Sequence, residues 1–161
     1  MYKKKILQLY YFNKFFSQMS SLLEGGDQNQ PQLPPLKQFS TRVVSLNCNV
    51  DVHVSSFHDR DLVVVTSSRK LGTLVSVDVV TSQNRPSTYQ LNVLFGRDDE
   101  MTSVFARTLA QVVDELRKGN SQQNTPGASK PILCCVALRE GEFGVVREVV
   151  EVLKTKCDVW C

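Results

Sequence analysis

The sequence predicts an α+β fold in which an antiparallel β-sheet of about five to six strands packs with two main α-helices. Residues 44–95 alternate between apolar and polar side chains or form short β-branched runs, which is typical of strands. Residues 101–117 and 143–156 instead repeat apolar side chains every three or four positions, which is typical of amphipathic helices. Valine supplies 23 of the 124 residues from Gln38 to Cys161, and this abundance favours a strand-rich body.

The first predicted strand covers residues 44–55, in a folded unit that we expect to begin near Phe39. Its even positions, Val44 to Val54, are apolar, and its odd positions are polar. This period of two predicts one face in the core and one in solvent. The segment is long for a single strand, so a tight turn or a bulge near residues 47–49 is a second option that the pattern leaves open. Residues 57–61 follow as a polar turn.

Three further strands are predicted before the first helix. Residues 62–66 form a continuous β-branched run, which indicates a central strand covered on both faces. Residues 73–80 and 89–95 follow as strands, and the polar segments 67–72 and 81–88 are the loops before them. Because short loops join these consecutive strands, we expect a meander of neighbouring antiparallel strands.

Two helices and one more strand complete the predicted domain. The helix over residues 101–117 follows the acidic run 98–100 and ends near two basic residues, an arrangement that suits the helix dipole. The polar stretch 119–130 is expected to be an exposed insertion, which costs little free energy in a surface loop. Residues 131–138 are expected to form a buried strand, and residues 143–156 a second helix.

The formal net charge of +3 belongs to the N-terminal part of the chain and not to the predicted domain. Residues 1–37 carry five lysines and two acidic residues, which accounts for the whole excess. Residues 38–161 carry fourteen basic and fourteen acidic residues. A neutral body has no broad field that attracts phosphates, so we expect no nucleic-acid partner.

The N-terminal part of the chain is expected to be an appendage. Residues 1–23 combine four lysines with several aromatic side chains, and three interpretations compete. The first is a mitochondrial transit peptide, although that class usually uses arginine. The second is a basic segment that lies at a membrane surface. The third is a dispensable extension, with Met19 as the start of a shorter chain. Residues 24–37 are rich in proline, glycine and glutamine and predict a flexible linker. We therefore expect residues 1–37 to be disordered and residues 38–161 to form one α+β domain.

The cysteines and the lack of long apolar runs predict the compartment. Five cysteines, an odd number, argue for reduced thiols inside the cell. No apolar run approaches the roughly 18 residues that a transmembrane helix requires. We therefore expect a soluble protein of the cytoplasm, with the nucleus as a further option, and no membrane partner.

No residue pattern predicts a catalytic site, a cofactor or a metal site. The two histidines lack further ligands at workable spacing, and a helix N-terminus accounts for the acidic run 98–100. Cys134 and Cys135 are adjacent on a predicted strand, so they point to opposite faces and act as small hydrophobes. Cys157 and Cys161 keep one alternative open, a small thiol-dependent enzyme or redox sensor that uses a C-terminal cysteine.

Exposed loop residues are the best candidates for contact with a protein partner. Arg69 and Lys70 lie in the loop before the strand 73–80, and Asn84 and Arg85 lie in the loop after it. Loops held by a rigid sheet are where binding residues concentrate. We therefore predict that these four residues bind an acidic surface on a partner.

Three stretches of the chain together resemble the proteasome assembly chaperone 3 family. They are LVVVTSSRKLGTLVSV (62–77), LNVLFGRDDEMTSVFARTLAQVV (91–113) and ILCCVALREGEFGVVREVVEVLKTKCDVW (132–160). Specificity comes from their combination, in order, over about 120 residues from Thr41 to Trp160. The shared landmarks, most of which determine the fold, are Val65, Thr66, Lys70, Gly72, Thr73, Leu74, Gly96, Asp98, Phe105 and Trp160.

The resemblance implies a small non-catalytic chaperone without a cofactor. It implies pairing with proteasome assembly chaperone 4, help in assembling the α-ring of the 20S proteasome, and release before the particle matures. It leaves open a homodimer in isolation, the face that pairs and the α-subunits that are contacted. Residues 1–37 and 119–130 depart from the family, so the resemblance implies nothing about their role.

Overall fold

The computed structural model describes residues 37–45, 48–68, 70–80, 87–120 and 130–160. The predictions for the N-terminal extension and for most of the polar insertion lie outside these residues. The elements, in chain order, are β1 (Lys37–Val44), β2 (Asn49–Ser56), β3 (Asp61–Thr66), β4 (Thr73–Val80), β5 (Thr88–Phe95), α2 (Glu100–Asn120), β6 (Ile132–Ala137), the 3-10 helix η1 (Phe143–Val145), α3 (Val146–Thr155) and α4 (Cys157–Trp160).

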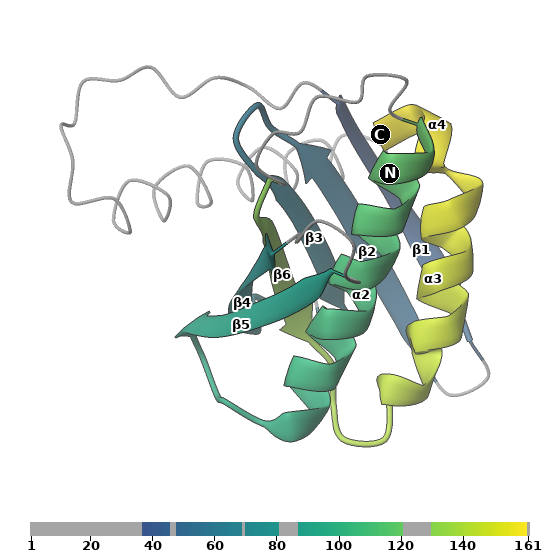
Figure 1. The fold of residues 1–161 in the computed structure, drawn as a ribbon. Helices are drawn as coiled ribbons and strands as arrows, with labels where there is room; N and C mark the ends of the chain where they lie inside the picture. Colours follow the sequence, from purple (N-terminus) through teal and green to yellow (C-terminus); the bar gives the residue numbers. More distant parts are fainter. Residues whose placement is uncertain (1–36, 46–47, 69, 81–86, 121–129, 161) are drawn as a thin grey trace, which may run out of the picture. The chain divides into compact units, whose positions relative to one another are not determined.

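The described strands form one six-stranded sheet in the order β1-β2-β3-β6-β4-β5 (Figure 1). β3 and β6 run parallel, and every other neighbouring pair is antiparallel. The predicted α+β class is confirmed, but the predicted meander is wrong, because β6 lies between β3 and β4. The physical reason is burial, since β3 and β6 are both covered on their two faces and therefore pair at the centre of the sheet.

β1 and β2 form a hairpin that divides the segment predicted as one long strand. Val43 pairs with Val50 across the hairpin. The turn shifts the alternation by one residue, so Val43 is buried whereas Val44 is 74% exposed. The prediction that Val44 faces the core is therefore wrong, and the alternative of a division near residues 47–49 is confirmed.

β1 begins earlier than the sequence indicated. It starts at Lys37, inside the segment predicted as linker, and Phe39 pairs with Val54 and packs against the core. The backbone hydrogen bonds of a paired strand do not require apolar side chains. The side-chain pattern therefore gave no sign that the strand begins at these polar positions.

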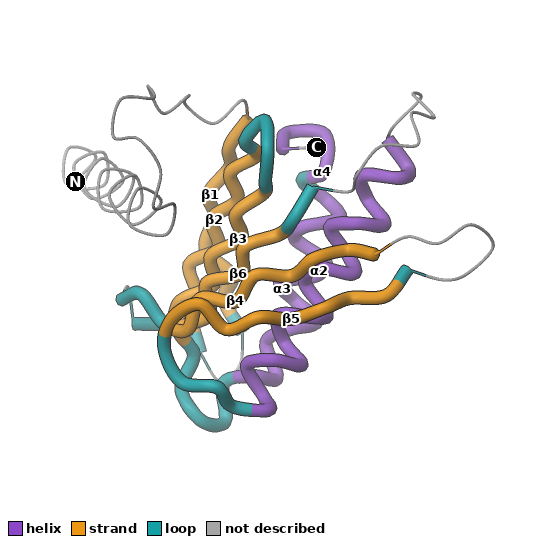
Figure 2. The backbone as a smooth tube through the Cα atoms, turned by 60° about the vertical axis from the view of Figure 1, so that its left-hand side comes forward, coloured by secondary structure: helices purple, strands orange, loops and turns teal. Residues whose placement is uncertain are grey.

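All described helices lie on one face of the sheet (Figure 2). α2 packs against β4, β5 and β6, while α3 and α4 lie over β1 and β2. The second predicted helix is built from η1 and α3, whose Val145, Val149 and Leu153 are buried. Trp160 is 1% exposed, and its Nε1 donates to the Leu153 carbonyl at 3.3 Å. The end of the described chain is thereby held against the core.

α2 begins where the acidic run 98–100 ends. Asp99 accepts hydrogen bonds from the Thr102 hydroxyl at 2.7 Å and from the Thr102 amide at 2.8 Å. These bonds lower the pKa of Asp99 and satisfy one of the unpaired amides of the first helical turn. The interpretation of this run as a helix N-terminus is confirmed.

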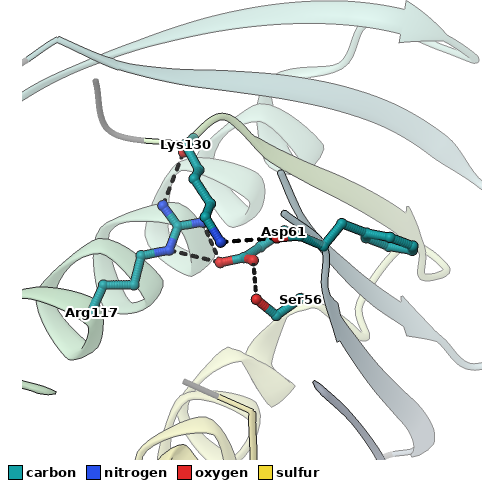
Figure 3. A network of polar contacts seen from close by, with 5 residues as sticks. Ser56, Asp61, Arg117 and Lys130 are labelled. Atoms are coloured by element: carbon teal, nitrogen blue, oxygen red, sulfur yellow. Dashed lines mark hydrogen bonds and ion pairs between the residues drawn. The ribbon is translucent and has the colours of Figure 1, made fainter. Parts of the chain in front are cut away.

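A partly buried polar cluster joins the C-terminal end of α2 to the centre of the sheet (Figure 3). Arg117 Nε donates to Asp61 Oδ2 at 2.7 Å, and a second guanidinium nitrogen contacts the same oxygen. Arg117 also donates to the Lys130 carbonyl at 2.9 Å, and Ser56 Oγ donates to Asp61 Oδ1 at 2.8 Å. Asp61, predicted as part of a polar turn, is instead the first residue of β3 and is 2% exposed. The cluster therefore connects α2 to β3 and to the segment that enters β6.

Candidate partner-binding surface

Four loops share one end of the sheet, where the parallel strands β3 and β6 both end. The strand register places them there, because the start of β2, the end of β3, the end of β6, the start of β4 and the end of β5 are successive neighbours. We call this the loop end, and its described segments are residues 45 and 48, 67–68 and 70–72, 96–99 and 138–142. The ends of parallel strands commonly carry binding residues on their loops.

Glu142 joins two loops of the loop end. Its Oε2 accepts from Ser67 Oγ at 2.5 Å and from the Arg139 amide at 2.8 Å. The bond from Ser67, followed by that from Arg139, lowers the pKa of Glu142. The Ser67 amide also donates to the Ala137 carbonyl at 3.1 Å. The turn between β3 and β4 is therefore fixed to the loop that follows β6.

Thr73 fixes a third loop to the same end. Its Oγ1 donates to the Arg97 carbonyl at 3.1 Å, and the Arg97 amide lies 3.3 Å from this hydroxyl. Ser45 Oγ, in the turn between β1 and β2, donates to Glu148 Oε1 on α3 at 3.2 Å. Each loop of the loop end thus has at least one side-chain bond to a neighbouring element. No local pattern in the sequence singles out Glu142 or Ser67, because both lie in short polar segments between predicted elements.

Lys70 is an exposed cation on a turn that is held at both ends. Its carbonyl accepts from Thr66 Oγ1 at 3.2 Å. On the other side, a Cβ atom at Gly72 would lie 1.9 Å from the Val136 carbonyl oxygen. Glycine is therefore required where the turn passes β6, because any side chain would collide with the backbone.

The other three predicted contact residues, Arg69, Asn84 and Arg85, lie outside the described residues. The two predicted loops are attached to opposite ends of β4. Lys70 precedes the first residue of β4, whereas residues 84 and 85 follow its last residue, Val80. A strand of this length spans about 23 Å, so the two loops are anchored at opposite ends of the sheet.

The described cysteines lie in the core or pack against it. Cys134 and Cys135 are buried, and burial raises the pKa of the Cys134 thiol to about 12. Cys48 packs against the core, and burial, followed by the charges of Glu142 and Glu148, raises its pKa. Cys157 is 7% exposed on α4, and Cys161 lies outside the described residues. Thiols with a raised pKa are poor nucleophiles, so Cys48 and Cys134 are poor candidates for a reactive thiol. The alternative that uses Cys157 or Cys161 stays a prediction.

The described ranges contain neither a membrane-spanning helix nor a metal-binding cluster. None of the helices there is long and apolar enough to cross a bilayer. No three histidine, cysteine, aspartate or glutamate side chains of that part of the chain are grouped so that they could hold a metal ion.

Known proteins resemble this chain over most of its length. A family model described as proteasome assembly chaperone 3 matches residues 63–156. Proteasome assembly chaperone 3 of Bos taurus is 30% identical over 125 residues, which cover 75% of this chain and 93% of that protein. The Homo sapiens protein of the same name is 30% identical over 118 residues, which cover 70% and 87%. A chain in the crystal structure of a novel chaperone complex for yeast 20S proteasome assembly has a TM-score of 0.48 and 14% identity, with coverage of 75% of this chain and 97% of that one.

Proposed function

Since the chain belongs to the proteasome assembly chaperone 3 family, we propose that it is a non-catalytic chaperone for assembly of the α-ring of the 20S proteasome. It forms a dimer with a subunit like proteasome assembly chaperone 4 and binds proteasome α-subunits transiently. The observation that carries this proposal is the family match over residues 63–156, which contain β4, β5, α2, β6 and α3 in full.

The loop end supports a binding role. Its turns are anchored to one another by Glu142 and Thr73, so little loop entropy is lost when a partner binds. Lys70, Arg97 and Arg139 are exposed cations on three of these anchored loops. Exposed charges increase the rate of association more than they increase affinity, which suits a contact that must later be released.

The cysteines support a cytoplasmic location for this activity. Cys48, Cys134 and Cys135 carry free thiols. Free thiols in a chain with an odd number of cysteines are expected in a reducing compartment. Fluorescence of the tagged full chain in the cytoplasm is the expected result, and accumulation inside mitochondria would instead support the transit-peptide interpretation of residues 1–23.

The partners are tested by purifying the full chain, tagged at its C-terminus, from cells and identifying the bound proteins by mass spectrometry. We expect a small subunit like proteasome assembly chaperone 4, and α-subunits from immature proteasomes. Mature 20S particles should be depleted from the bound fraction, because the chaperone leaves before maturation. Recovery of neither class of partner would contradict the proposal.

The predicted contact residues are tested by charge reversal at each loop separately. Arg69→Glu with Lys70→Glu changes the turn before β4, and Asn84→Ala with Arg85→Glu changes the loop after it. For the loop that contacts α-subunits, we expect their capture to fall about tenfold, because reversed charges slow association. Capture of the chaperone partner should be unchanged.

The matched control is Arg107→Glu, which reverses an exposed charge in the middle of α2, away from both loops. This control should retain full capture of α-subunits. All three variants should be as stable as the wild type within about 0.5 kcal/mol, since the changes are on the surface. Equal loss of capture in Arg107→Glu would show that net charge, and not the loops, controls binding.

A further inference from the structure

Ser45, in the turn between β1 and β2, has an arginine three positions before it. The segment reads RVVS (42–45), and no other serine in the sequence has an arginine at that spacing. Protein kinases select substrates by the charges around the serine, and one large class of them requires a basic side chain at this position. The Arg42 side chain is 48% exposed, so it is open to recognition. The segment therefore has the charge pattern of a kinase substrate.

The place of Ser45 in the fold makes it accessible to an enzyme. β1 is an edge strand of the sheet, and β2 is its one sheet neighbour within the described part of the chain. β1 ends at Val44, which is 74% exposed, and the Ser45 side chain is half-buried. An extended segment at an open sheet edge is a form in which other proteins bind a chain. Ser45 follows directly after such a segment.

The Ser45 hydroxyl is bonded to a carboxylate on α3. Its Oγ donates to Glu148 Oε1 at 3.2 Å. The other carboxylate oxygen, Glu148 Oε2, is buried and has no hydrogen-bond partner among the described residues. A buried acceptor without a partner costs free energy, so this carboxylate tolerates a further loss of bonds poorly. The contact between the turn and α3 therefore depends on a hydroxyl that a kinase can modify.

We propose that Ser45 is a phosphorylation site for a kinase that selects basic residues, and that the phosphate separates the β1–β2 turn from α3. The kinase transfers the γ-phosphoryl group of ATP to Ser45 Oγ. The bond from that phosphorus to the β-phosphate oxygen breaks, ADP leaves, and the hydroxyl proton passes to a base of the kinase. The donor of the bond to Glu148 is thereby replaced by a group that carries about two negative charges.

The groups around the turn favour repulsion over a new bond. Burial, followed by the charges of Glu142 and Glu148, raises the pKa of Cys48, so two negative charges already act on the turn. Phosphate groups often bind free amides at a helix N-terminus. Here η1 precedes α3, and the Val145 amide donates to the Glu142 carbonyl at 3.1 Å, while the Val146 amide donates within η1. The start of α3 therefore does not offer these amides to a phosphate.

This proposal does not depend on the proposed function, because it concerns only the turn and α3. The turn is nevertheless one segment of the loop end. Phosphorylation of Ser45 would thus alter one border of the candidate partner-binding surface, through a like-charge contact that was absent before.

The modification is tested with the purified full chain, ATP and a calmodulin-dependent protein kinase that selects arginine three positions before serine. We expect mass spectrometry to find phosphate on Ser45. Arg42→Gln should slow its addition at least about tenfold, because the recognised charge is lost. Arg107→Gln, a matched change at an exposed arginine of α2, should not slow it. The absence of phosphate on Ser45, or equal slowing by both substitutions, would overturn the site.

The structural effect is tested by hydrogen exchange of the phosphorylated and the unmodified full chain. Release of the turn should speed exchange in the first turns of α3, residues 146–150, at least about tenfold, because this part of the helix loses a packed neighbour. Exchange in β3 should stay the same. Slower exchange in α3 would show that the phosphate binds the helix, and this result, like unchanged exchange, would overturn the proposed separation.

Substitutions separate the added charge from the lost hydrogen bond. Ser45→Ala removes only the bond, so it should speed exchange in α3 less than Ser45→Glu, which also adds a charge facing Glu148. The difference between the two should shrink in the Glu148→Gln background, because the repulsion is then absent. Gln38→Glu is the matched control, since it adds the same charge at the other end of β1 and should leave α3 unchanged. A difference that Glu148→Gln leaves intact would overturn the role of Glu148.

Discussion

The two ends of the sheet use polar side chains in opposite ways. Where β3 begins, Asp61 is almost inaccessible and is bonded to Arg117 and Ser56 (Figure 3). At the loop end, Glu142 also forms bonds to its neighbours, but it holds together loops that leave Lys70 exposed. The first arrangement connects a helix to the sheet, and the second presents charged turns on rigid supports. This contrast separates residues that should control stability from residues that should control binding.

The largest effect is expected from Arg117→Ala, which breaks the ion pair between half-buried Arg117 and buried Asp61. Asp61 would remain buried without its partner, and removing one member of a buried pair typically costs about 3–5 kcal/mol. The free energy of unfolding is measured by urea denaturation at neutral pH. Capture of partners should fall only in proportion to the unfolded fraction, because the cluster lies away from the loop end.

The matched control for this change is the exposed pair of Arg42 and Asp51, whose closest atoms are 2.7 Å apart. Their side chains are 48% and 37% exposed, so solvent screens the attraction and Arg42→Ala should lower the free energy of unfolding far less than Arg117→Ala does. If both substitutions cost the same, burial would not distinguish the two pairs, and the contrast between the ends of the sheet would be lost.

An intermediate effect is expected from Gly72→Ala at the loop end. The added methyl group would collide with the Val136 carbonyl, and such crowding typically costs about 1–3 kcal/mol. The turn that carries Lys70 must move to relieve the collision. We therefore expect capture of α-subunits to fall even in protein that is fully folded, which a pull-down at low temperature measures.

Gly144→Ala is the control, because a Cβ atom at this position would meet no atom within 4 Å apart from its chain neighbours and its own helical backbone. This variant should keep both stability and capture. Full capture by folded Gly72→Ala protein would show that the position of the turn does not matter for binding.

The smallest effect is expected from acid. Hydrogen bonds lower the pKa of Glu142 and of Asp99, so each carboxylate stabilises the fold at any pH above its unfolded pKa, about 4.3 and 3.9. This stabilisation is lost as the pH falls through the lower folded pKa of each group. Glu142→Gln should therefore flatten part of the decline in stability below about pH 4, measured by thermal melting. An acid decline identical to that of the wild type would show that Glu142 does not hold the loops together.

Short-range patterns predicted most of the elements of this fold. The β-branched run after Asp61 became the central strand β3, and helical spacing predicted α2 with its acidic start capped by Asp99. Which side chains of β1 face the core was not predictable in the same way. Val43 and Val44 are both apolar, and the position of the turn decides which of them is buried.

The candidate site was predictable in part. Lys70 is exposed on a turn, as expected for the loop before β4. Its supports were not foreseen, because Ser67 and Glu142 are 75 residues apart in the sequence and no local pattern connects them. The two predicted loops are attached to opposite ends of β4 because of the way this strand runs through the sheet. The sequence positions of the loop residues do not reveal this arrangement.

Composition and local periodicity were sufficient to identify a strand-rich α+β domain with two main helices, because neighbouring side chains alone decide whether a segment presents an apolar face. The insertion of β6 between β3 and β4, and the ion pair between residues 56 positions apart, required the folded chain. The reason is that sheet order and buried polar pairs depend on which distant segments compete for the same buried position. That competition is settled by packing across the whole domain, where β3 and β6 are both covered on two faces.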